Sequence, residues 1–337
     1  MKDSSLLECK ICGNTDRNII YKVREMMLGK RDTHNYFECS DCGCLQIVEV
    51  PENIQEYYPS EDYYSYDEIK PASGFKGKLI RSRDRFAATG KGILGGIMQQ
   101  IQPHDKLPSL QHANININSK ILDVGCGAGH LLHSMKEAGF NNILGIDPYN
   151  TKDIQYDNGL TIIKNSIHDL SPKNSSDDKN YGANGGWDLI MFNHSYEHVL
   201  DQVEVLEKTW DLLAPGGICM LRIPTVTSWA WRHYSEDWVQ LDAPRHFFLH
   251  SIKSVHLLAE KTGFALEDVV YDSFAFQSWG SEQYKQDIAL HDENSYAVNP
   301  EKSPFSTADI NSFTEHSNVL NKSKAGDQAA FYLKKLV

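Results

Sequence analysis

A glycine-rich segment, GCGAG at residues 125–129, is the clearest chemical signal in the sequence. Glycine lets the backbone turn sharply and lets a ligand come close to the main chain. An apolar run at residues 120–124 leads into the segment and a helical pattern follows it, as in the turns of nucleotide-binding folds. The segment therefore predicts a site for a nucleotide-like cofactor.

Three neighbouring positions narrow the choice of cofactor. Asp123 stands two residues before the first glycine, where its carboxylate can orient the loop and the ammonium group of an amino-acid ligand. Asp147 ends a second apolar run, which is the place for a carboxylate that accepts both ribose hydroxyls. A dinucleotide-binding fingerprint needs a third small residue where this chain has His130. The alternative is a nucleotide fold that binds another ligand.

Five of the seven cysteines fall in the first 44 residues, and four of them form two Cys-x-x-Cys pairs. The pairs are Cys9 with Cys12 and Cys39 with Cys42, and glycine follows each pair. Two such turns can point four thiolates at one tetrahedral zinc ion, which leaves no open coordination position and predicts a structural site. Cys44 is spare, and we expect it to be a buried thiol, with an alternative metal ligand as the second interpretation. A redox centre would need a thioredoxin-like surrounding sequence.

The elements that position these residues alternate along the chain from residue 119 onward. Short apolar runs alternate with helical segments, which is typical of a parallel α/β sheet. We expect strands at residues 120–124, 143–147, 160–164, 188–193, 217–223, 265–272 and 329–335. We expect helices at about residues 129–139, 198–213 and 251–262.

The composition divides the chain into three parts. Residues 1–50 form the cysteine-rich unit, and residues 51–118 form an aromatic, acidic linker followed by a basic helix at about residues 76–102. Residues 119–337 form the α/β domain, with a polar and irregular insertion at about residues 275–325. The basic helix could bind a diphosphate or an anionic surface, but a solvated helix face is the simpler interpretation.

Four features resemble, in their order and spacing, the class I S-adenosylmethionine-dependent methyltransferases. They are Asp123, the glycine-rich segment, Asp147 and the turn LAPGG at residues 213–217. The resemblance covers roughly residues 119–272 and the final strand. It implies a Rossmann-like α/β fold with a seven-stranded sheet whose last strand is antiparallel, and S-adenosylmethionine as the cofactor. Asp147 would bind the ribose, and the stretch at Ser166, which usually carries Asp, would contact adenine. In full, the resemblance assigns cofactor binding to Asp123, Gly125, Cys126, Gly127, Gly129, Asp147, Pro148, Ser166, Ile167 and Asn193.

The segment NHSYEHV at residues 193–199 follows the fourth strand, at the carboxyl edge of the sheet beside the cofactor. Methyl transfer is an in-line displacement, so a hydroxyl acceptor must be positioned and its proton removed. In similar sugar C-methyltransferases the Glu-His pair, here Glu197 and His198, includes the base, whereas in many class I enzymes it shapes the loop. His246 is the second candidate base. With His194, this pair also has the spacing with which some quinone-type O-methyltransferases bind a divalent metal, although those have Glu at the first position.

A zinc ribbon before a class I core resembles bacterial enzymes that methylate sugars or nucleotide-linked sugars. The sugar C-methyltransferases among them carry a large domain after the core that this chain is too short to hold, so we expect O-methylation over C-methylation. In the family, residues after the fifth strand form an acceptor lid, where Arg232 and Arg245 can hold a phosphate. The alternatives are O-methylation of a small aromatic or quinone-like acceptor, and a non-catalytic zinc-ribbon binding module.

The net charge of −12 argues against broad nucleic-acid affinity, because phosphate binding needs a surplus of Lys and Arg. No stretch approaches the roughly 20 apolar residues that span a bilayer, and the N-terminus lacks a signal-peptide pattern. We therefore expect a cytoplasmic enzyme of polysaccharide biosynthesis that acts on a small acceptor and has no nucleic-acid partner.

Overall fold

The computed structural model describes residues 7–58, 74–171 and 185–336. Its central sheet consists of β4 (Ile121–Val124), β5 (Ile143–Ile146), β6 (Ile154–Gln155), β7 (Thr161–Ile163), β8 (Trp187–Asn193), β9 (Leu213–Pro224), β11 (Phe264–Tyr271) and β12 (Gln328–Lys335). The strands lie in the order β11-β12-β9-β8-β4-β5-β7-β6. Strands β9, β8, β4, β5 and β7 are parallel, whereas β12 is antiparallel to both neighbours. The predicted α/β class and antiparallel last strand are confirmed.

The sheet has eight strands rather than the expected seven. The additional strand is β6, which pairs antiparallel with β7 at the edge of the sheet. A tight turn makes the pairing possible, because the amide of Tyr156 donates to the carbonyl of Leu160 (3.0 Å) and the amide of Gly159 donates to that of Tyr156 (2.9 Å). Two residues are too few for an alternating pattern, so the sequence did not reveal this strand.

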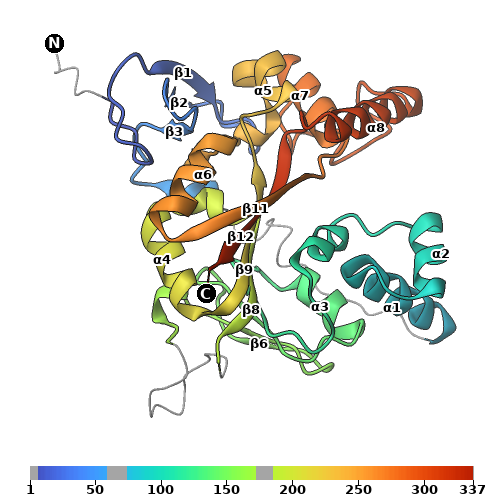
Figure 1. The fold of residues 1–337 in the computed structure, drawn as a ribbon. Coiled ribbons are helices and arrows are strands. Elements are labelled where there is room, and N and C mark those ends of the chain that lie inside the picture. The colour runs from blue at the N-terminus through green and yellow to red at the C-terminus, as the bar shows by residue number, and fades with distance from the viewer. Residues whose placement is uncertain (1–6, 59–73, 172–184, 337) are drawn as a thin grey trace.

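Helices cover both faces of the sheet (Figure 1). They are α1 (Gly74–Thr89) and α3 (His130–Glu137) on one face, and α4 (Gln202–Leu212) and α6 (Ile252–Lys261) on the other. Successive strand residues point to opposite faces. Leu122 and Ile190 accordingly pack in the cluster that includes α4 and α6, whereas Ile121 and Leu189 pack in the cluster that includes α1 and α3. The sheet therefore carries a hydrophobic core on each side.

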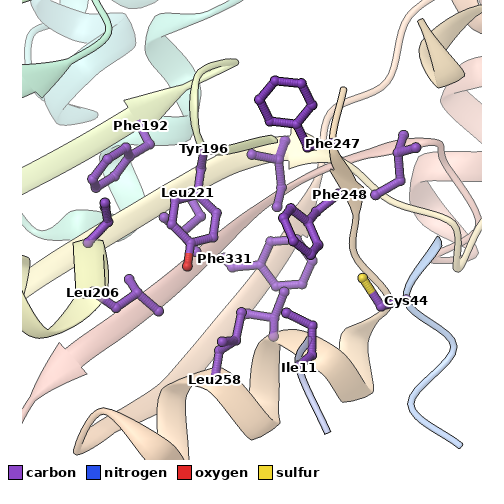
Figure 2. Packing of buried hydrophobic residues seen from close by; sticks show 14 of the residues in the cluster. Ile11, Cys44, Phe192, Tyr196, Leu206, Leu221, Phe247, Phe248, Leu258 and Phe331 are labelled. Atoms are coloured by element: carbon purple, nitrogen blue, oxygen red, sulfur yellow. The ribbon is translucent and has the colours of Figure 1, made fainter. Parts of the chain in front are cut away.

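The N-terminal unit (residues 7–50) shares a core with the central sheet. Its strands β1 (Ile19–Arg24), β2 (Thr33–Glu38) and β3 (Leu45–Ile47) form an antiparallel sheet with β10 (Phe248–Leu249), which comes from the second half of the chain. Figure 2 shows Ile11 and Cys44 of the unit in the same cluster as Leu221 and Phe331. Cys44 is fully buried, as expected.

The single helix expected at residues 76–102 is two helices, α1 and α2 (Ile93–Ile101). The break falls at Gly90 and Gly92, whose φ angles of 70° and 112° end a right-handed helix. The helices form a hairpin at the side of the molecule (Figure 1). They pack closely, because a Cβ atom at Gly95 would lie 2.2 Å from the carbonyl oxygen of Ser82 in α1. The prediction missed this break because the apolar pattern continues beyond the two glycines.

The segment at residues 275–325, expected to be irregular, contains α7 (Phe276–Lys285) and α8 (Thr307–Lys322). A capping box of Ser306 and Asp309 starts α8. This helix buries only Ser317 and Leu320, so its sequence lacks the broad apolar stripe that identifies a helix. Between β9 and β10 lies the short helix α5 (Trp229–Tyr234). Among the described residues, none of the helices combines the length and the apolar character that a membrane crossing requires.

His250 is fully buried where the N-terminal unit, α4 and α6 meet. Its Nδ1 lies 3.1 Å from the hydroxyl of Ser254, and its Nε2 lies 2.8 Å from the side-chain oxygen of Gln202. Both ring nitrogens of the neutral imidazole are therefore satisfied. Burial lowers the pKa of His250 to about 4.

We predict that the free energy of unfolding falls at acid pH and that His250 is a major cause. In the unfolded chain its pKa is about 6.5, so the unfolded state takes up the proton first as the pH falls from about 6.5 towards 4. The stability lost by pH 4 amounts to about 3 kcal/mol. Chemical denaturation of the wild type and of His250→Gln at pH 7 and pH 4 measures this, and the variant should lose about 3 kcal/mol less. Equal losses in the two proteins would contradict the assignment.

Candidate active site

The glycine-rich loop lies at the carboxyl edge of the parallel strands, between β4 and α3. The amide of Gly125 donates to the carbonyl of Ile146 at the end of β5 (2.8 Å), which ties the loop to the neighbouring strand. The φ angle of Gly125 is 74°, and a Cβ atom there would lie only 2.5 Å from the Cβ of Ser195. The loop after β8 thus packs directly on the glycine-rich loop, and only glycine fits the contact.

Asp147 binds the other side of the glycine-rich loop through hydrogen bonds. One carboxylate oxygen accepts from the amide of Gly127 and the other from the amide of Tyr149, both at 2.8 Å. The side chain of Asn150 donates to the carbonyl of Gly127 (2.9 Å). Burial raises the pKa of Asp147, while the backbone hydrogen bonds oppose this effect. The structure therefore brings together Asp147 and the glycine-rich loop, as the sequence predicts.

Asp123 is buried, and its Oδ1 has no hydrogen-bond partner among the described residues. Burial and the nearby charge of Asp147 raise the pKa of Asp123 well above its usual value. A buried carboxylate oxygen without a partner is costly. A cationic group of a ligand would supply the missing partner. S-adenosylmethionine carries such a group at its amino-acid end, so the residues present fit this cofactor.

The other predicted cofactor residues lie along the same edge in different environments. Ser166 caps the turn that follows β7, where its hydroxyl accepts from the amide of His168 (3.3 Å), and Ile167 is buried. Pro148 is exposed beside Asp147.

Two further predicted cofactor residues flank the loop and the end of β8. Asn193 ends β8, and its side-chain oxygen accepts from Arg222 (3.0 Å). Burial raises the pKa of the Cys126 thiol well above its usual value, which makes this residue a neutral lining group.

His198 ends a short helical turn after β8 (Tyr196–His198). Its Nδ1 lies 2.8 Å from the carbonyl oxygen of Arg245. A carbonyl only accepts, so Nδ1 carries the hydrogen and Nε2 keeps its lone pair. Burial and the charge of His246 lower the pKa of His198 to about 4. His198 is therefore neutral near pH 7 and can accept a proton at Nε2.

Glu197 lies beside the predicted histidines and is fully buried. Its carboxylate has no hydrogen-bond partner within the described residues, but one oxygen lies 3.4 Å from Nδ1 of His194 and 3.9 Å from Nε2 of His246. Burial raises the pKa of Glu197, but the contact with His194 and the charges of the surrounding histidines outweigh this and lower it to about 2. Glu197 is thus an ionised group that the histidine rings surround.

His246 is buried, and its ring meets that of His198 edge to face, with centroids 4.8 Å apart. Its Nδ1 lies 2.8 Å from the carbonyl of Gln240, so its Nε2 faces Glu197 and also Asp242 (3.6 Å). Both ring nitrogens of His246 face groups of the protein, so His246 is better placed to position its neighbours than to contact an acceptor.

The buried group of Glu197, His198 and His246 could also bind a metal ion. Glu197, His198 and His246 offer ligand atoms within 4.8 Å of one another, a set that could hold a divalent cation. This set differs from the sequence-based one, because His246 takes the place of His194.

The expectation that Arg245 holds a phosphate is wrong. Its guanidinium group is buried between the carboxylates of Asp242 and Glu25 and donates to the carbonyl of Tyr57 (3.1 Å). Arg232 is exposed.

The structure adds two residues that sequence reasoning missed, Ser195 and Tyr149, and it places Tyr58 of the aromatic linker beside His198. The hydroxyl of Ser195 donates to the carbonyl of Val124 (2.5 Å), next to the glycine-rich loop. The ring of Tyr58 stacks on that of Tyr149, and its hydroxyl lies 3.1 Å from Nδ1 of His198. Tyr149 could have been found from its place two residues after Asp147.

The four predicted zinc ligands come together in the N-terminal unit. Their sulfur atoms lie within 4.8 Å of one another, with Cys9–Cys42 and Cys12–Cys39 distances of 3.5 Å. After each pair a glycine amide donates to the carbonyl of the first cysteine at 2.8 Å, which forms the expected turns. A tetrahedral zinc ion with Zn–S bonds of about 2.3 Å separates its sulfur ligands by about 3.8 Å. The four cysteines therefore fit such an ion.

Comparisons with known proteins identify the family. The profile of a family described as "Methyltransferase domain" matches residues 79–269, more than half of the chain. A ubiquinone biosynthesis O-methyltransferase of Psychrobacter cryohalolentis is 32% identical over 104 residues, which are 30% of this chain and 39% of that protein. A tRNA U34 carboxymethyltransferase of Idiomarina loihiensis is 24% identical over 219 residues, which are 55% of this chain and 64% of that protein.

The chain spans less than two thirds of the length of these two curated relatives. A solved S-adenosylmethionine-dependent methyltransferase of Mesorhizobium loti is 15% identical and has a TM-score of 0.43, covering 68% of this chain and 98% of that one. The family match over residues 79–269 contains the glycine-rich loop, Asp147 and His198. The chain belongs to the class I S-adenosylmethionine-dependent methyltransferase family.

Proposed function

We propose that the protein transfers the methyl group of S-adenosylmethionine to a hydroxyl group of a small acceptor, with His198 as the general base. The observation that carries this proposal is the position of His198. Its Nδ1–H is held by the carbonyl of Arg245, and its Nε2 keeps a lone pair at the sheet edge that also holds the glycine-rich loop. A neutral imidazole beside a methyl donor is suited to removing a hydroxyl proton.

When bound, S-adenosylmethionine supplies an electrophilic methyl group on a sulfonium. The residues of the chain would hold and orient it: Asp147 would accept the ribose hydroxyls, Asp123 would pair with the ammonium group, and the loop backbone would lie against the methionine moiety. Nε2 of His198 would accept the proton of the acceptor hydroxyl, which would free the oxygen to receive the methyl group that the cofactor supplies. The carbonyl of Arg245 keeps the ring oriented during the transfer. The imidazolium then releases the proton to solvent.

The first candidate acceptor is a saccharide or a nucleotide-linked sugar, and the second is a quinone-like phenol. The four-cysteine unit before the core supports the sugar through the resemblance to sugar methyltransferases. The relative named ubiquinone biosynthesis O-methyltransferase supports the phenol. The charge of −12 disfavours RNA, although one relative is named for a tRNA. Incubation with nucleotide sugars, quinol-like phenols and tRNA, with formation of S-adenosylhomocysteine as the readout, decides among the three.

The four cysteines bind one structural zinc ion in this proposal. Four thiolates complete a tetrahedral site, so the ion holds the N-terminal unit together and takes no part in the transfer. The support is the close approach of the four sulfur atoms and their glycine turns.

Asp147→Ala is expected to weaken the binding of S-adenosylmethionine by about 30-fold or more. A charge-assisted hydrogen bond contributes about 2 kcal/mol, and the substitution also releases the amide of Gly127. Isothermal titration calorimetry measures the Kd. Asp157→Ala, which removes an exposed carboxylate, is the matched control and should bind like the wild type. Failure of the wild type to bind S-adenosylmethionine would reject the enzyme in favour of a non-catalytic binding module.

His198→Gln is expected to lower kcat by about 10²- to 10⁴-fold, the usual contribution of a general base, and to leave the Kd for S-adenosylmethionine unchanged. Since the pKa of His198 is about 4 and only the neutral ring accepts a proton, the wild-type rate should fall as the pH drops through about 4 rather than 6.5. His246→Gln should lose less, and His112→Gln, at an exposed histidine, should lose nothing. Full turnover by His198→Gln would remove this residue from the mechanism.

Purified protein is expected to contain about one zinc ion per chain by elemental analysis. The double variant Cys9→Ser/Cys42→Ser should contain almost none and should melt at a lower temperature, because the metal is part of the folding free energy. Cys44→Ala should keep its zinc, since Cys44 lies outside the four-sulfur cluster. A metal-free wild type with a fully folded N-terminal unit would refute the zinc site.

A further inference from the structure

We propose that the hairpin of α1 and α2 docks on an anionic phospholipid surface, with α2 lying in the interface. The apolar side chains that α2 presents outward carry the first part of the case. Ile93 is 88% exposed and Ile101 is 71% exposed, and Leu94 and Ile97 are more than half exposed. Spacings of three and four residues place these side chains on one side of the helix. The nine residues of α2 include no charged side chain.

The apolar side chains are held outward by the packing of the opposite side of α2. Gly95 is buried against α1, where an added Cβ would collide with the carbonyl of Ser82. The next residue, Gly96, lies under the ring of Phe86. Two consecutive glycines let the helices approach closely, so α2 cannot rotate its apolar side chains inward without losing this contact. The exposed apolar side is therefore a fixed feature of the hairpin.

The charge of the hairpin complements an anionic surface. Residues 74–106 contain seven Lys or Arg residues and two Asp residues, in a chain whose net charge is −12. Three arginines of α1 are used inside the protein: Arg81 pairs with Glu137, Arg83 with Asp84, and Arg85 donates to the carbonyl of Ala138. The lysines are exposed, and none pairs with a carboxylate in the described part of the chain; they are Lys76, Lys78, Lys91 and Lys106.

A lipid surface fits these features better than other partners do. Nucleic acid would match the lysines but would leave the aliphatic side chains exposed to water. A helix of nine residues is about 14 Å long and about 10 Å wide, so it offers a second copy of the chain far less than the roughly 800 Å² per partner of a stable interface. Helices with an apolar side flanked by lysines lie in the headgroup region of anionic membranes. With nine residues α2 is too short to cross the bilayer.

The hairpin is also attached rigidly to the helix that starts at the glycine-rich loop. Arg85 of α1 donates to the carbonyl of Ala138 at the end of α3 (2.7 Å), and Arg81 reaches Glu137 (3.4 Å). Docking of α2 would therefore hold the whole domain in one orientation on the surface.

The test is co-sedimentation of the full-length protein with large unilamellar vesicles. The protein should bind vesicles of phosphatidylcholine with about 30% phosphatidylglycerol and should bind pure phosphatidylcholine at least tenfold more weakly. Because each lysine near an anionic surface contributes about fivefold to partitioning, Lys76→Gln/Lys78→Gln/Lys91→Gln should reduce binding by about a hundredfold. Binding should also fall when the salt concentration rises from about 0.1 to about 0.5 M, as screening increases.

A second triple variant, Ile93→Gln/Ile97→Gln/Ile101→Gln, keeps the charge and removes the apolar side. It should lose at least tenfold in binding while its melting temperature stays unchanged, because these side chains are exposed. The matched control is Val319→Gln, which removes an exposed apolar side chain from α8 and should bind like the wild type. Wild-type binding by the isoleucine variant would overturn the proposal. So would self-association of the wild type that this variant abolishes, since a second copy would then be the occupant.

Discussion

The proposed active site depends on one constraint: residues 242–250 are held from two sides. From the N-terminal unit, the hydroxyl of Tyr36 donates to the carbonyl of His246 (2.8 Å), and an amide of β3 donates to the carbonyl of Phe247 (3.0 Å). From the core, the carbonyl of Glu197 accepts from the amide of Phe247 (2.8 Å). The N-terminal unit is therefore part of the scaffold that brings His246 to Glu197. Its four-cysteine cluster lies outside the site, and in the proposed function a zinc ion there would stabilise this scaffold.

A buried charge network fixes the same segment. Burial opposes the charge of Arg245, but Asp242 outweighs this effect and raises the pKa of Arg245. Buried ion pairs add little net stability, because desolvation offsets their attraction. Their value here is geometric: the network holds the carbonyl of Arg245 at the place where it receives Nδ1–H of His198. The tautomer of the proposed base is thus set by the main-chain carbonyl of Arg245.

The sequence predicted those parts of the site that follow from strand order. Apolar runs locate β4, β5 and β8, and parallel strands bring their carboxyl ends together, so the glycine-rich loop, Asp147 and His198 had to meet. The contact between Glu197 and His246 was beyond this reasoning, because it depends on the pairing of β10 with β3. The hairpin of α1 and α2 was likewise beyond this reasoning, because it depends on the close approach of Gly95 to Ser82 in α1.

The raised pKa of Asp123 bears on how the proposed site would bind its methyl donor. Asp123 is buried near Asp147, and burial and this charge raise its pKa, while the positive charge of Lys106 opposes them. A cationic donor would lower that pKa, so binding of the donor and release of a proton from Asp123 are coupled, and each favours the other. Methyl transfer would remove the positive charge of the sulfonium, whereas the carboxylates of Asp147 and Glu197 would remain. In the proposed reaction the site would therefore attract the charged donor more strongly than the thioether product, and this would favour the exchange of product for a new donor.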